Sequence, residues 1–401
     1  MNKALLFIFV TVLLDVIGIG IIIPILPSLI QELTQTNVSK AAGYAAGLIT
    51  TYSVMQLIFS PIIGGLSDQY GRRPVLLLAL LGFGLDYILL ALSTSIAWLF
   101  IGRMIAGIFG ASFTTAGAYI ADISEPEKRA QNFGILGAAF GIGFIIGPAL
   151  GGLMAGFGLR APFWMSAALT LLNALYGYFI LPESLKRENR KKFSIREANP
   201  IGAILKFTSY PVIASLLLCI FLVYMSNFAT QGTWSFYTIE RFGWTEWEVG
   251  LSLGFIGVMV AIVQGGAIRL IIKKLGQSKT LLLGLLLNFI GLLLFALAQE
   301  GWQMYAIVAL YSFGGLAGPA FQGIMSSVVS PSEQGVLQGA LTSLNSLAAI
   351  LGQPLMLGLF SFFTSDKAMI YLPSAPFIMG TLLVGITFFL AQIALKKIGT
   401  N

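Results

Sequence analysis

The 401-residue chain has no histidine, one cysteine and few charges. Charged residues make up 10% of it and hydrophobic residues 57%, whereas soluble proteins carry about 25% charged residues. This composition excludes an ordinary soluble domain and indicates an all-α polytopic membrane protein. Because histidine is missing, proton chemistry near neutral pH must fall to carboxylates. The single Cys219 excludes an intrachain disulfide.

Other functional classes find little support. The formal net charge is +7, but no clustered basic face is visible, so we expect no nucleic-acid partner. The sequence shows no metal-ligand cluster and no nucleophile–base constellation, so we expect no catalytic residue, no metal and no enzyme activity. A non-transporting membrane sensor would need a soluble output domain, and none is visible. The first apolar run contains Asp15 and no small-residue cleavage site, which indicates a retained helix and not a signal peptide.

Windows of about 20 apolar residues suffice to cross a bilayer. The sequence predicts twelve: 4–31, 41–65, 74–93, 97–121, 132–156, 161–182, 209–237, 247–273, 278–298, 302–329, 334–360 and 370–395. The one long hydrophilic connector, 183–208, separates a six-helix bundle at 1–182 from another at 209–401. Lys and Arg gather in the connector and in loops on its side of the membrane, so the positive-inside rule places both termini in the cytoplasm.

The turn at 64–73 combines one acid, two arginines and three glycines between two apolar runs. Asp68 beside Arg72 and Arg73 can form charge-assisted bonds that hold helix ends together, with Gly64 and Gly71 allowing close approach. Asp122, at the end of the fourth window, could join this network; a solvated turn is the alternative.

The second half repeats glycine and proline positions of the first half at a constant spacing. A shift of 205 residues places Gly71 on Gly276, Pro126 on Pro331 and Gly147 on Gly352. Two similar halves suit a transporter that rocks around a site near the bilayer midplane.

The turn matches the pattern G-x-x-x-D-[RK]-x-G-R-[RK] except at Gln69. With this signature the chain resembles the major facilitator superfamily. More narrowly it resembles the tetracycline/proton antiporters, through the segments 14–20, 56–61, 71–78, 85–87, 241–244 and 334–339. The resemblance implies twelve helices in two pseudo-symmetric halves, alternating access and drug export from the bacterial cytoplasmic membrane.

Three charged residues of the first half fall inside predicted spans, which is costly unless they face a cavity, find a partner or exchange a proton. Asp15 and Asp86 lie in the middle of the first and third windows, and Arg103 opens the fourth. Arg103 also resembles the superfamily's R-x-x-x-G motif, which implies a part in proton transfer. We therefore expect the three residues to couple transport to protons. A helix-packing role for Asp15 and a snorkelling role for Arg103 are the alternatives.

The fifth window contains Gly143, Gly147, Pro148, Gly151 and Gly152. Three of these glycines recur every four residues, which forms a smooth stripe for another helix, and the proline permits a kink. The run resembles the superfamily's antiporter motif G-x-x-x-G-P-x-x-G-G, and only this resemblance implies export. A packing seam is the plain interpretation.

Amides and an indole at membrane depth predict a mostly apolar cavity for an amphipathic ligand. The candidates are Gln56, Asn227, Gln231, Trp234, Gln264, Asn288 and Gln322. In the tetracycline antiporters the second half carries an intramembrane acid and often a histidine, where this chain has Asn288 and Val260. We predict a monomeric proton-coupled exporter of a small amphipathic molecule, tetracycline-like first, that needs no cofactor beyond the proton gradient. A facilitator or importer of a metabolite, or a transporter of a lipid-like substrate, is the alternative.

Overall fold

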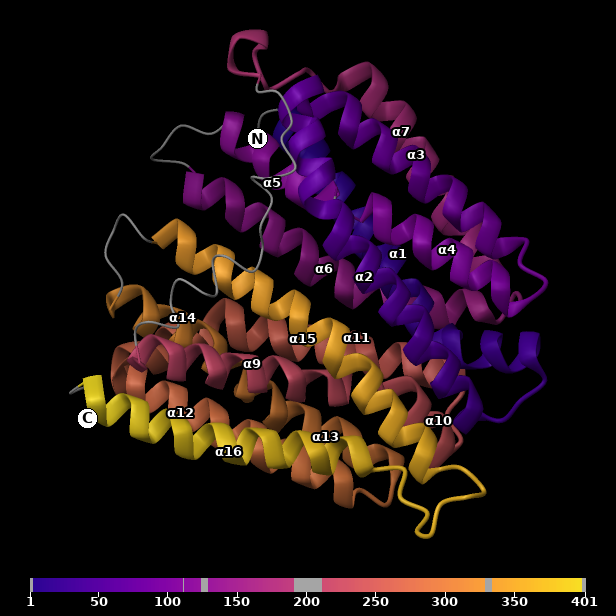
Figure 1. The fold of residues 1–401 in the computed structure, drawn as a ribbon. Helices are drawn as coiled ribbons and strands as arrows, with labels where there is room; N and C mark the ends of the chain where they lie inside the picture. Colours follow the sequence, from indigo (N-terminus) through magenta and orange to yellow (C-terminus); the bar gives the residue numbers. More distant parts are fainter. Residues whose placement is uncertain (1–2, 111, 124–128, 191–210, 329–333, 399–401) are drawn as a thin grey trace. The chain divides into compact units, whose positions relative to one another are not determined.

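The computed structural model describes residues 3–110, 112–123, 129–190, 211–328 and 334–398, and within these ranges all regular secondary structure is helical (Figure 1). Hydrocarbon offers no hydrogen-bond partner, so a segment that crosses it must satisfy its backbone N–H and C=O groups internally, which a helix does. The long apolar runs of this chain therefore become helices despite prolines inside α1, α6 and α15.

The first part of the chain forms seven α-helices and a short 3-10 turn. They are α1 (Lys3–Thr34), α2 (Val38–Tyr70), α3 (Arg72–Ala91), α4 (Ile96–Phe109), α5 (Ser112–Ile123), α6 (Arg129–Ala155), α7 (Ala161–Ile180) and η2 (Arg187–Asn189).

The second part contains eight α-helices, one π-helical segment and one 3-10 segment. They are α9 (Pro211–Gln231), α10 (Trp234–Phe242), α11 (Glu246–Ile262), the π segment η4 (Val263–Ala267), α12 (Ile268–Leu297), α13 (Gly301–Tyr311), the 3-10 segment η5 (Ser312–Leu316), α14 (Ala317–Val328), α15 (Gln334–Phe363) and α16 (Ala375–Ile398).

Among the described residues, nine helices are long and apolar enough to cross a membrane, and two shorter apolar helices, Ile96–Phe109 and Ala139–Ala155, accompany them. An integral multi-pass membrane protein is the consequence. The total of twelve spans and the cytoplasmic termini stay predictions. Residues 124–128 and 191–210, which include most of the predicted connector, lie outside the described residues.

Several predicted windows differ from the observed helices. The window 209–237 is interrupted, since α9 ends at Gln231 and α10 begins at Trp234. The intervening Thr233 turns its hydroxyl back onto the carbonyl oxygen of Ala229, a local bond that competes with the regular helix pattern. The windows 247–273 and 278–298 meet inside α12, where Gly276 has φ 74° and ψ 169° and breaks the helix. Glycine adopts such a positive φ without steric cost.

The chain divides into two compact units. The first unit comprises residues 1–36, 47–198 and 245–254, and the second comprises 37–46, 199–244 and 255–401. The second unit therefore includes the first turns of α2, and the first unit includes the first turns of α11. The predicted bundle boundaries at 182 and 209 stay a prediction.

In the first unit α1 packs against α6 and α7, and α3 packs against α7 and α4. Figure 1 shows α3 and α7 side by side. Phe7, Val12, Leu80 and Tyr119 form the centre of its core, and each is at most 2% exposed. This packing places the ends of α2, α3, α5 and α7 near one another, which builds the first part of the candidate site.

In the second unit α9 packs against α15 and α16, and α12 packs against α16, α14 and η5. Its core is aromatic. The Phe295 ring stands edge-on to Trp234 at 5.3 Å between centroids and lies 5.6 Å from the Phe377 ring. Such offset and edge-to-face pairs add to the stabilisation from burial.

Candidate functional site

The charged turn at 64–73 connects α2 to α3 through Gly71. This residue has φ 107°, and a Cβ built on it would lie 2.2 Å from Oε2 of Glu183. A side chain there would be strained by the backbone and would collide with a carboxylate. Gly64 is different, because a Cβ at that position would meet no described atom within 4 Å. The predicted need for close approach therefore holds at Gly71 and not at Gly64.

Arg72 joins three elements in this turn. Its side chain is 10% exposed, and Nη1 lies 2.5 Å from Oδ1 of Asp68. The same Nη1 donates to Oγ of Ser67 at 2.6 Å, and Nε donates to Oδ2 of Asp122 at 3.2 Å. The structure thus brings Asp68, Arg72 and Asp122 together. Charge-assisted bonds of this kind are about twice as strong as neutral ones, so this network can hold the ends of α2, α3 and α5 together.

Arg73 points elsewhere. Its Nη2 donates to the carbonyl oxygen of Tyr178 at 2.6 Å, and its guanidinium lies 5.5 Å from the centre of the Tyr178 ring. Arg73 therefore fastens α3 to α7 and is not a partner of Asp68. The expectation that both arginines serve one network needs this correction, because consecutive residues on a helix do not face the same neighbour.

Glu183 is a member of the turn that the sequence interpretation missed. Its Oε1 accepts from the backbone N–H of Arg72 at 2.8 Å, and its Oε2 accepts from that of Arg73 at 3.3 Å. Nη2 of Arg190 lies 3.8 Å from the same Oε2. These two N–H groups belong to the first turn of α3, which carries unsatisfied donors and partial positive charge. Glu183 therefore caps α3 from a position just after α7. The one sequence signal was an acid directly after Pro182.

The corresponding turn in the second half makes fewer contacts with its surroundings. Gly276 keeps a positive φ, but no described atom lies within 4 Å of a Cβ built there. Lys273 stands where the first copy has Asp68. The repeat therefore preserves the backbone turn and not the acid that pairs with arginine.

Asp86 and Arg103 meet between α3 and α4. The Asp86 side chain is fully buried, and its Oδ2 lies 3.5 Å from Nη2 of Arg103. Within the described residues neither carboxylate oxygen accepts a hydrogen bond. A Cβ on Gly102 would lie 2.7 Å from Oδ1, so glycine makes room for the carboxylate. A fully buried carboxylate beside one guanidinium and without a hydrogen bond is costly at membrane depth unless it finds a further partner or exchanges a proton.

Two tyrosines connect this pair to α1 and α2. The carboxylates of Asp15 and Asp86 and the guanidinium of Arg103 all lie within electrostatic range of the Tyr87 hydroxyl. A Cβ on Gly18 would lie 2.0 Å from that hydroxyl oxygen, so the Tyr87 side chain fills the gap that glycine leaves in α1. Asp15 itself is buried, with 7% exposed. The three predicted coupling residues are thus gathered in one unit around Tyr87.

Tyr52 and Gln56 cover the Arg103 side of this cluster. The Arg103 guanidinium lies 6.0 Å from the centre of the Tyr52 ring. Gln56 donates from Nε2 to the Tyr52 hydroxyl and to the carbonyl oxygen of Gly110, both at 3.3 Å. Gln56 is half-buried, and its bond to the hydroxyl positions Tyr52. Tyr52 was not predicted, since a tyrosine in an apolar run carries no charge signal.

The antiporter motif in α6 packs on two helices. Cβ atoms built on Gly147 and Gly151 would lie 2.8 Å and 2.3 Å from the carbonyl oxygens of Ile17 and Ile21, so this stripe contacts α1. A Cβ on Gly152 would lie 2.5 Å from the carbonyl oxygen of Glu246 at the start of α11. Each of these contacts requires glycine, which makes the motif a close-packed seam.

The same seam extends to both ends of the motif. A Cβ on Gly143 would lie 2.8 Å from the Val16 side chain, and one on Gly250 would lie 2.5 Å from the carbonyl oxygen of Pro148. The Ser28 hydroxyl of α1 donates to Glu246. Because α1 and the first turns of α11 share α6 as a common support, a shift of α6 would move both.

The predicted cavity residues of the second unit are not equally accessible. Gln231, Gln264 and Gln322 are exposed and Asn227 is half-buried. Trp234 is 1% exposed and packs in the aromatic core against Phe295, so it does not line an open wall. Asn288 is 4% exposed.

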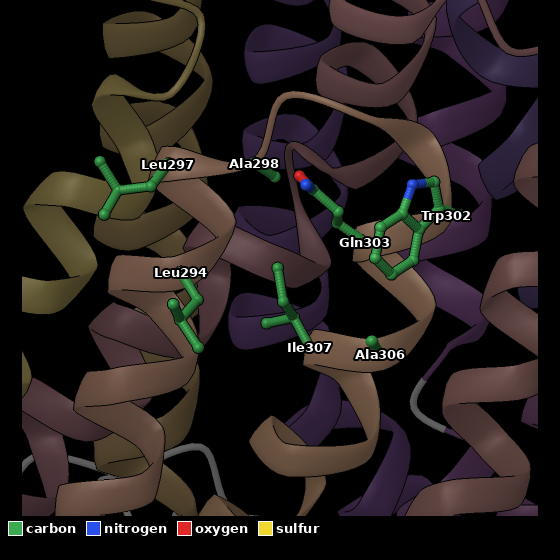
Figure 2. Close-up of a pocket in the computed structure, with 7 residues that line it drawn as sticks. All are labelled: Leu294, Leu297, Ala298, Trp302, Gln303, Ala306 and Ile307. Atoms are coloured by element: carbon green, nitrogen blue, oxygen red, sulfur yellow. The ribbon is translucent and has the colours of Figure 1, made fainter.

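One pocket in the second unit is lined by none of these candidates. It has a volume of about 290 Å³ and is lined by Leu294, Leu297, Ala298, Trp302, Gln303, Ala306 and Ile307. Figure 2 shows these side chains at the end of α12 and the beginning of α13. The lining is almost entirely apolar and its one amide oxygen is bonded to the N–H groups of Gln299 and Glu300, which leaves little chemistry for recognition. Within the described residues no cluster of His, Cys, Asp or Glu could hold a metal ion.

Comparison with known proteins identifies relatives over most of the chain. A family model described as Major Facilitator Superfamily matches residues 8–353. The chain is 37% identical over 361 residues to the tetracycline resistance protein, class C, of Escherichia coli, covering 90% of each. It is 39% identical over 375 residues to the class E protein of the same species, covering 90% of this chain and 89% of the relative.

A solved structure shares the fold. The human organic anion transporter MFSD10 is 26% identical to this chain with a TM-score of 0.70, covering 97% of this chain and 99% of the transporter.

Proposed function

The chain belongs to the Major Facilitator Superfamily, and on that premise we propose that it is a proton-coupled antiporter that exports a small amphipathic molecule. Its family and relatives are membrane transporters and not enzymes. Tetracycline-type compounds are the first candidate substrates, because the relatives at 37% and 39% identity are named tetracycline resistance proteins. The gradient of protons across the membrane supplies the energy, so no cofactor enters the proposal.

The observation that carries proton coupling is the Asp86–Arg103 pair. Asp86 is fully buried, its nearest cation is 3.5 Å away, and its oxygens accept no hydrogen bond in the described structure. A carboxylate held this way is neutral or charged depending on small changes around it. Substrate binding near Asp15 and Tyr87 would alter that balance, and so would movement of α4 relative to α3. Proton release would then accompany one direction of the transport cycle.

The charged turn supplies the conformational part of the proposal. We propose that both termini lie in the cytoplasm, that twelve helices cross the bacterial cytoplasmic membrane, and that a monomer carries out transport. On this arrangement the network of Asp68, Arg72 and Asp122 lies at the cytoplasmic ends of α2, α3 and α5. Its ion pairs stabilise one arrangement of these ends and must break, or be shielded, when the cytoplasmic side opens.

Transport into inverted membrane vesicles tests the proposal. With an imposed pH gradient, vesicles containing the wild-type chain are expected to accumulate tetracycline, and Asp86→Asn and Asp15→Asn are expected to abolish the gradient-driven part. Asp366→Asn is the matched control, because Asp366 is an exposed acid in the segment between α15 and α16. If Asp86→Asn accumulates as much tetracycline as the control, proton coupling at this pair is wrong.

A second candidate function is a facilitator or importer of a metabolite. The specific observation in its favour is that the sequence from 249 to 299 and from 301 to 332 contains no Asp or Glu. Proton carriage would then rest on the first unit alone. Counterflow of a preloaded substrate without any pH gradient would favour the facilitator; strict dependence on the gradient favours the antiporter.

A further inference from the structure

One face of α1 carries polar positions through the otherwise apolar core of the first unit. Thr11, Asp15 and Gly18 are spaced by four and three residues, which places them on the same side of the helix. Gly18 leaves room for the Tyr87 hydroxyl. Thr11 is 1% exposed, and its hydroxyl oxygen accepts from Nδ2 of Asn173 at 3.0 Å. This face therefore leads from the coupling residues one turn toward the N-terminal end of α1, and there it meets α7.

The helix α5 carries a second polar face with the same spacing. Thr115, Tyr119 and Asp122 share one side of this helix. Thr115 and Tyr119 are 0% exposed, and Asp122 is the partner of Arg72 in the charged turn. The Tyr119 hydroxyl donates to the carbonyl oxygen of Pro182 at 2.8 Å. It also lies within electrostatic range of the Asp122 carboxylate. This face therefore leads from the buried centre of the unit to the charged turn.

The two polar faces come together in the core of the first unit. α5 packs against α1, and α1 packs against α7. The residues that follow three of the polar positions in sequence belong to one buried cluster, and they are Val12, Ala116 and Ala174. Ser184, just after α7, donates to Asp122 at 3.0 Å, so the ends of α5 and α7 lie together. With a rise of 1.5 Å per residue, Thr115 and Asn173 each lie about 10 Å along their helices from these ends. They are therefore at similar depth.

Both side chains at this depth have an unmet hydrogen-bonding need. Within the described residues, Oγ1 of Thr115 and Oδ1 of Asn173 are buried and have no hydrogen-bond partner. The two residues are 0% and 4% exposed. An unpaired buried polar atom is costly, and buried water commonly satisfies such atoms through about three hydrogen bonds. A hydroxyl can donate and accept, and an amide oxygen accepts, so the pair suits water as its ligand.

We propose that Thr11, Asn173 and Thr115 hold water between α1, α5 and α7, and that this water joins the two polar faces into a path for proton release from Asp15 to Asp122. This inference rests on the proposed function, since a release path serves a proton-coupled transporter. At each step an oxygen accepts a proton from one side and gives up its own on the other, so one O–H bond forms as another breaks. The Asn173 amide positions the water and takes up no proton. The proton and the substrate then leave the coupling residues by separate routes.

Two transport modes separate this role from a packing role. Thr115→Val keeps the shape of the side chain and removes the hydroxyl. In inverted vesicles we expect its gradient-driven tetracycline uptake to be about tenfold slower than that of the wild type, as for the loss of one hydrogen bond. Exchange of external for internal tetracycline without a pH gradient moves no net proton and should keep its wild-type rate. Thr115→Ser restores a hydroxyl and should recover gradient-driven uptake.

Thr387→Val is the matched control for this variant. Thr387 is also 0% exposed, but it lies in the second unit and its hydroxyl donates to the carbonyl oxygen of Leu383 at 2.8 Å. Equal gradient-driven uptake by Thr115→Val and Thr387→Val would overturn the path. So would a fall in exchange as large as the fall in driven uptake, because that result indicates damage to the fold.

Isotope exchange tests the path without any substrate. The infrared absorption of a protonated carboxyl group shifts when deuterium replaces its proton. In the purified chain at acidic pH, the band that Asp15→Asn removes reports on Asp15. After transfer to D2O, we expect this band to shift about tenfold more slowly in Thr115→Val than in Thr387→Val. Absence of the band, or equal rates, would contradict the path. If the wild-type chain shows no gradient-driven tetracycline uptake, the proposed function fails, and the exchange rates still decide the path.

Discussion

Glu183 offers the sharpest test of how the charged turn is held. Replacing it with Gln keeps the shape of the side chain and removes the charge that caps α3. The carboxylate accepts from the N–H groups of Arg72 and Arg73 at 2.8 Å and 3.3 Å, and its side chain is 27% exposed. An anion in the first turn of a helix contributes about 0.3–1 kcal/mol, and hydrogen bonds to charged groups about 1.5–3 kcal/mol each. Because the site is partly exposed, we expect a net loss of about 2 kcal/mol.

The expected effect has two readouts. A loss of about 2 kcal/mol shifts an equilibrium roughly 30-fold, so Glu183→Gln should lower both the thermal stability of the purified chain and gradient-driven transport in vesicles. The matched control is Glu188→Gln, since Glu188 is an exposed acid in the nearby η2 turn. Thermal unfolding followed by loss of the solubilised monomer measures the first effect. If the two variants are equally stable and equally active, the capping role assigned to Glu183 is refuted.

Three further outcomes follow from the two turns and from the segment between α15 and α16. Asp68→Asn should impair transport far more than Lys273→Asn, because only Asp68 has an arginine partner at 2.5 Å; equal vesicle uptake would contradict this. Gly71→Ala should destabilise the purified chain in a thermal scan, since φ is 107° and Cβ would lie 2.2 Å from a carboxylate oxygen; an unchanged midpoint would be inconsistent with that geometry. Burial, followed by the hydrogen bond to Glu240, raises the pKa of Tyr371 to about 12 from the usual 10. The neutral phenol is favoured in the folded state, so stability should fall between pH 10 and 12, and Tyr371→Phe should remove that fall in a pH series of unfolding scans.

The sequence predicted the helices well because their signal is local. Long apolar runs become helices wherever hydrocarbon surrounds them, and Asp68 and Arg72 lie one helical turn apart, so their pairing could be anticipated. Interactions between distant segments were less accessible. Glu183 caps α3 across a separation of 111 residues, and nothing near Arg72 in sequence indicates it. The η4 and η5 segments also carried no signal beyond glycine pairs.

The sequence predicted the residues of the candidate coupling site, but not how they are arranged in space. The free-energy cost of placing a charged side chain at membrane depth identifies Asp15, Asp86 and Arg103 individually. Their gathering depends on Gly18, which accommodates the Tyr87 hydroxyl, and on Gly102, which accommodates the Asp86 carboxylate. A glycine inside an apolar run does not reveal which side chain will fill its place. The pairing of Asp86 with Arg103 therefore came from the packing of α3 on α4.

Proton movement caused by the substrate tests the central claim most directly. Inverted vesicles containing the chain are acidified inside, and a trapped pH-sensitive dye reports the pH after tetracycline is added outside. If Asp86 and Arg103 couple export to protons, tetracycline should raise the internal pH with the wild-type chain and with Asp366→Asn, and should leave it unchanged with Asp86→Asn. A rise of equal size with Asp86→Asn, or tetracycline uptake by the wild-type chain without any rise, would contradict the account.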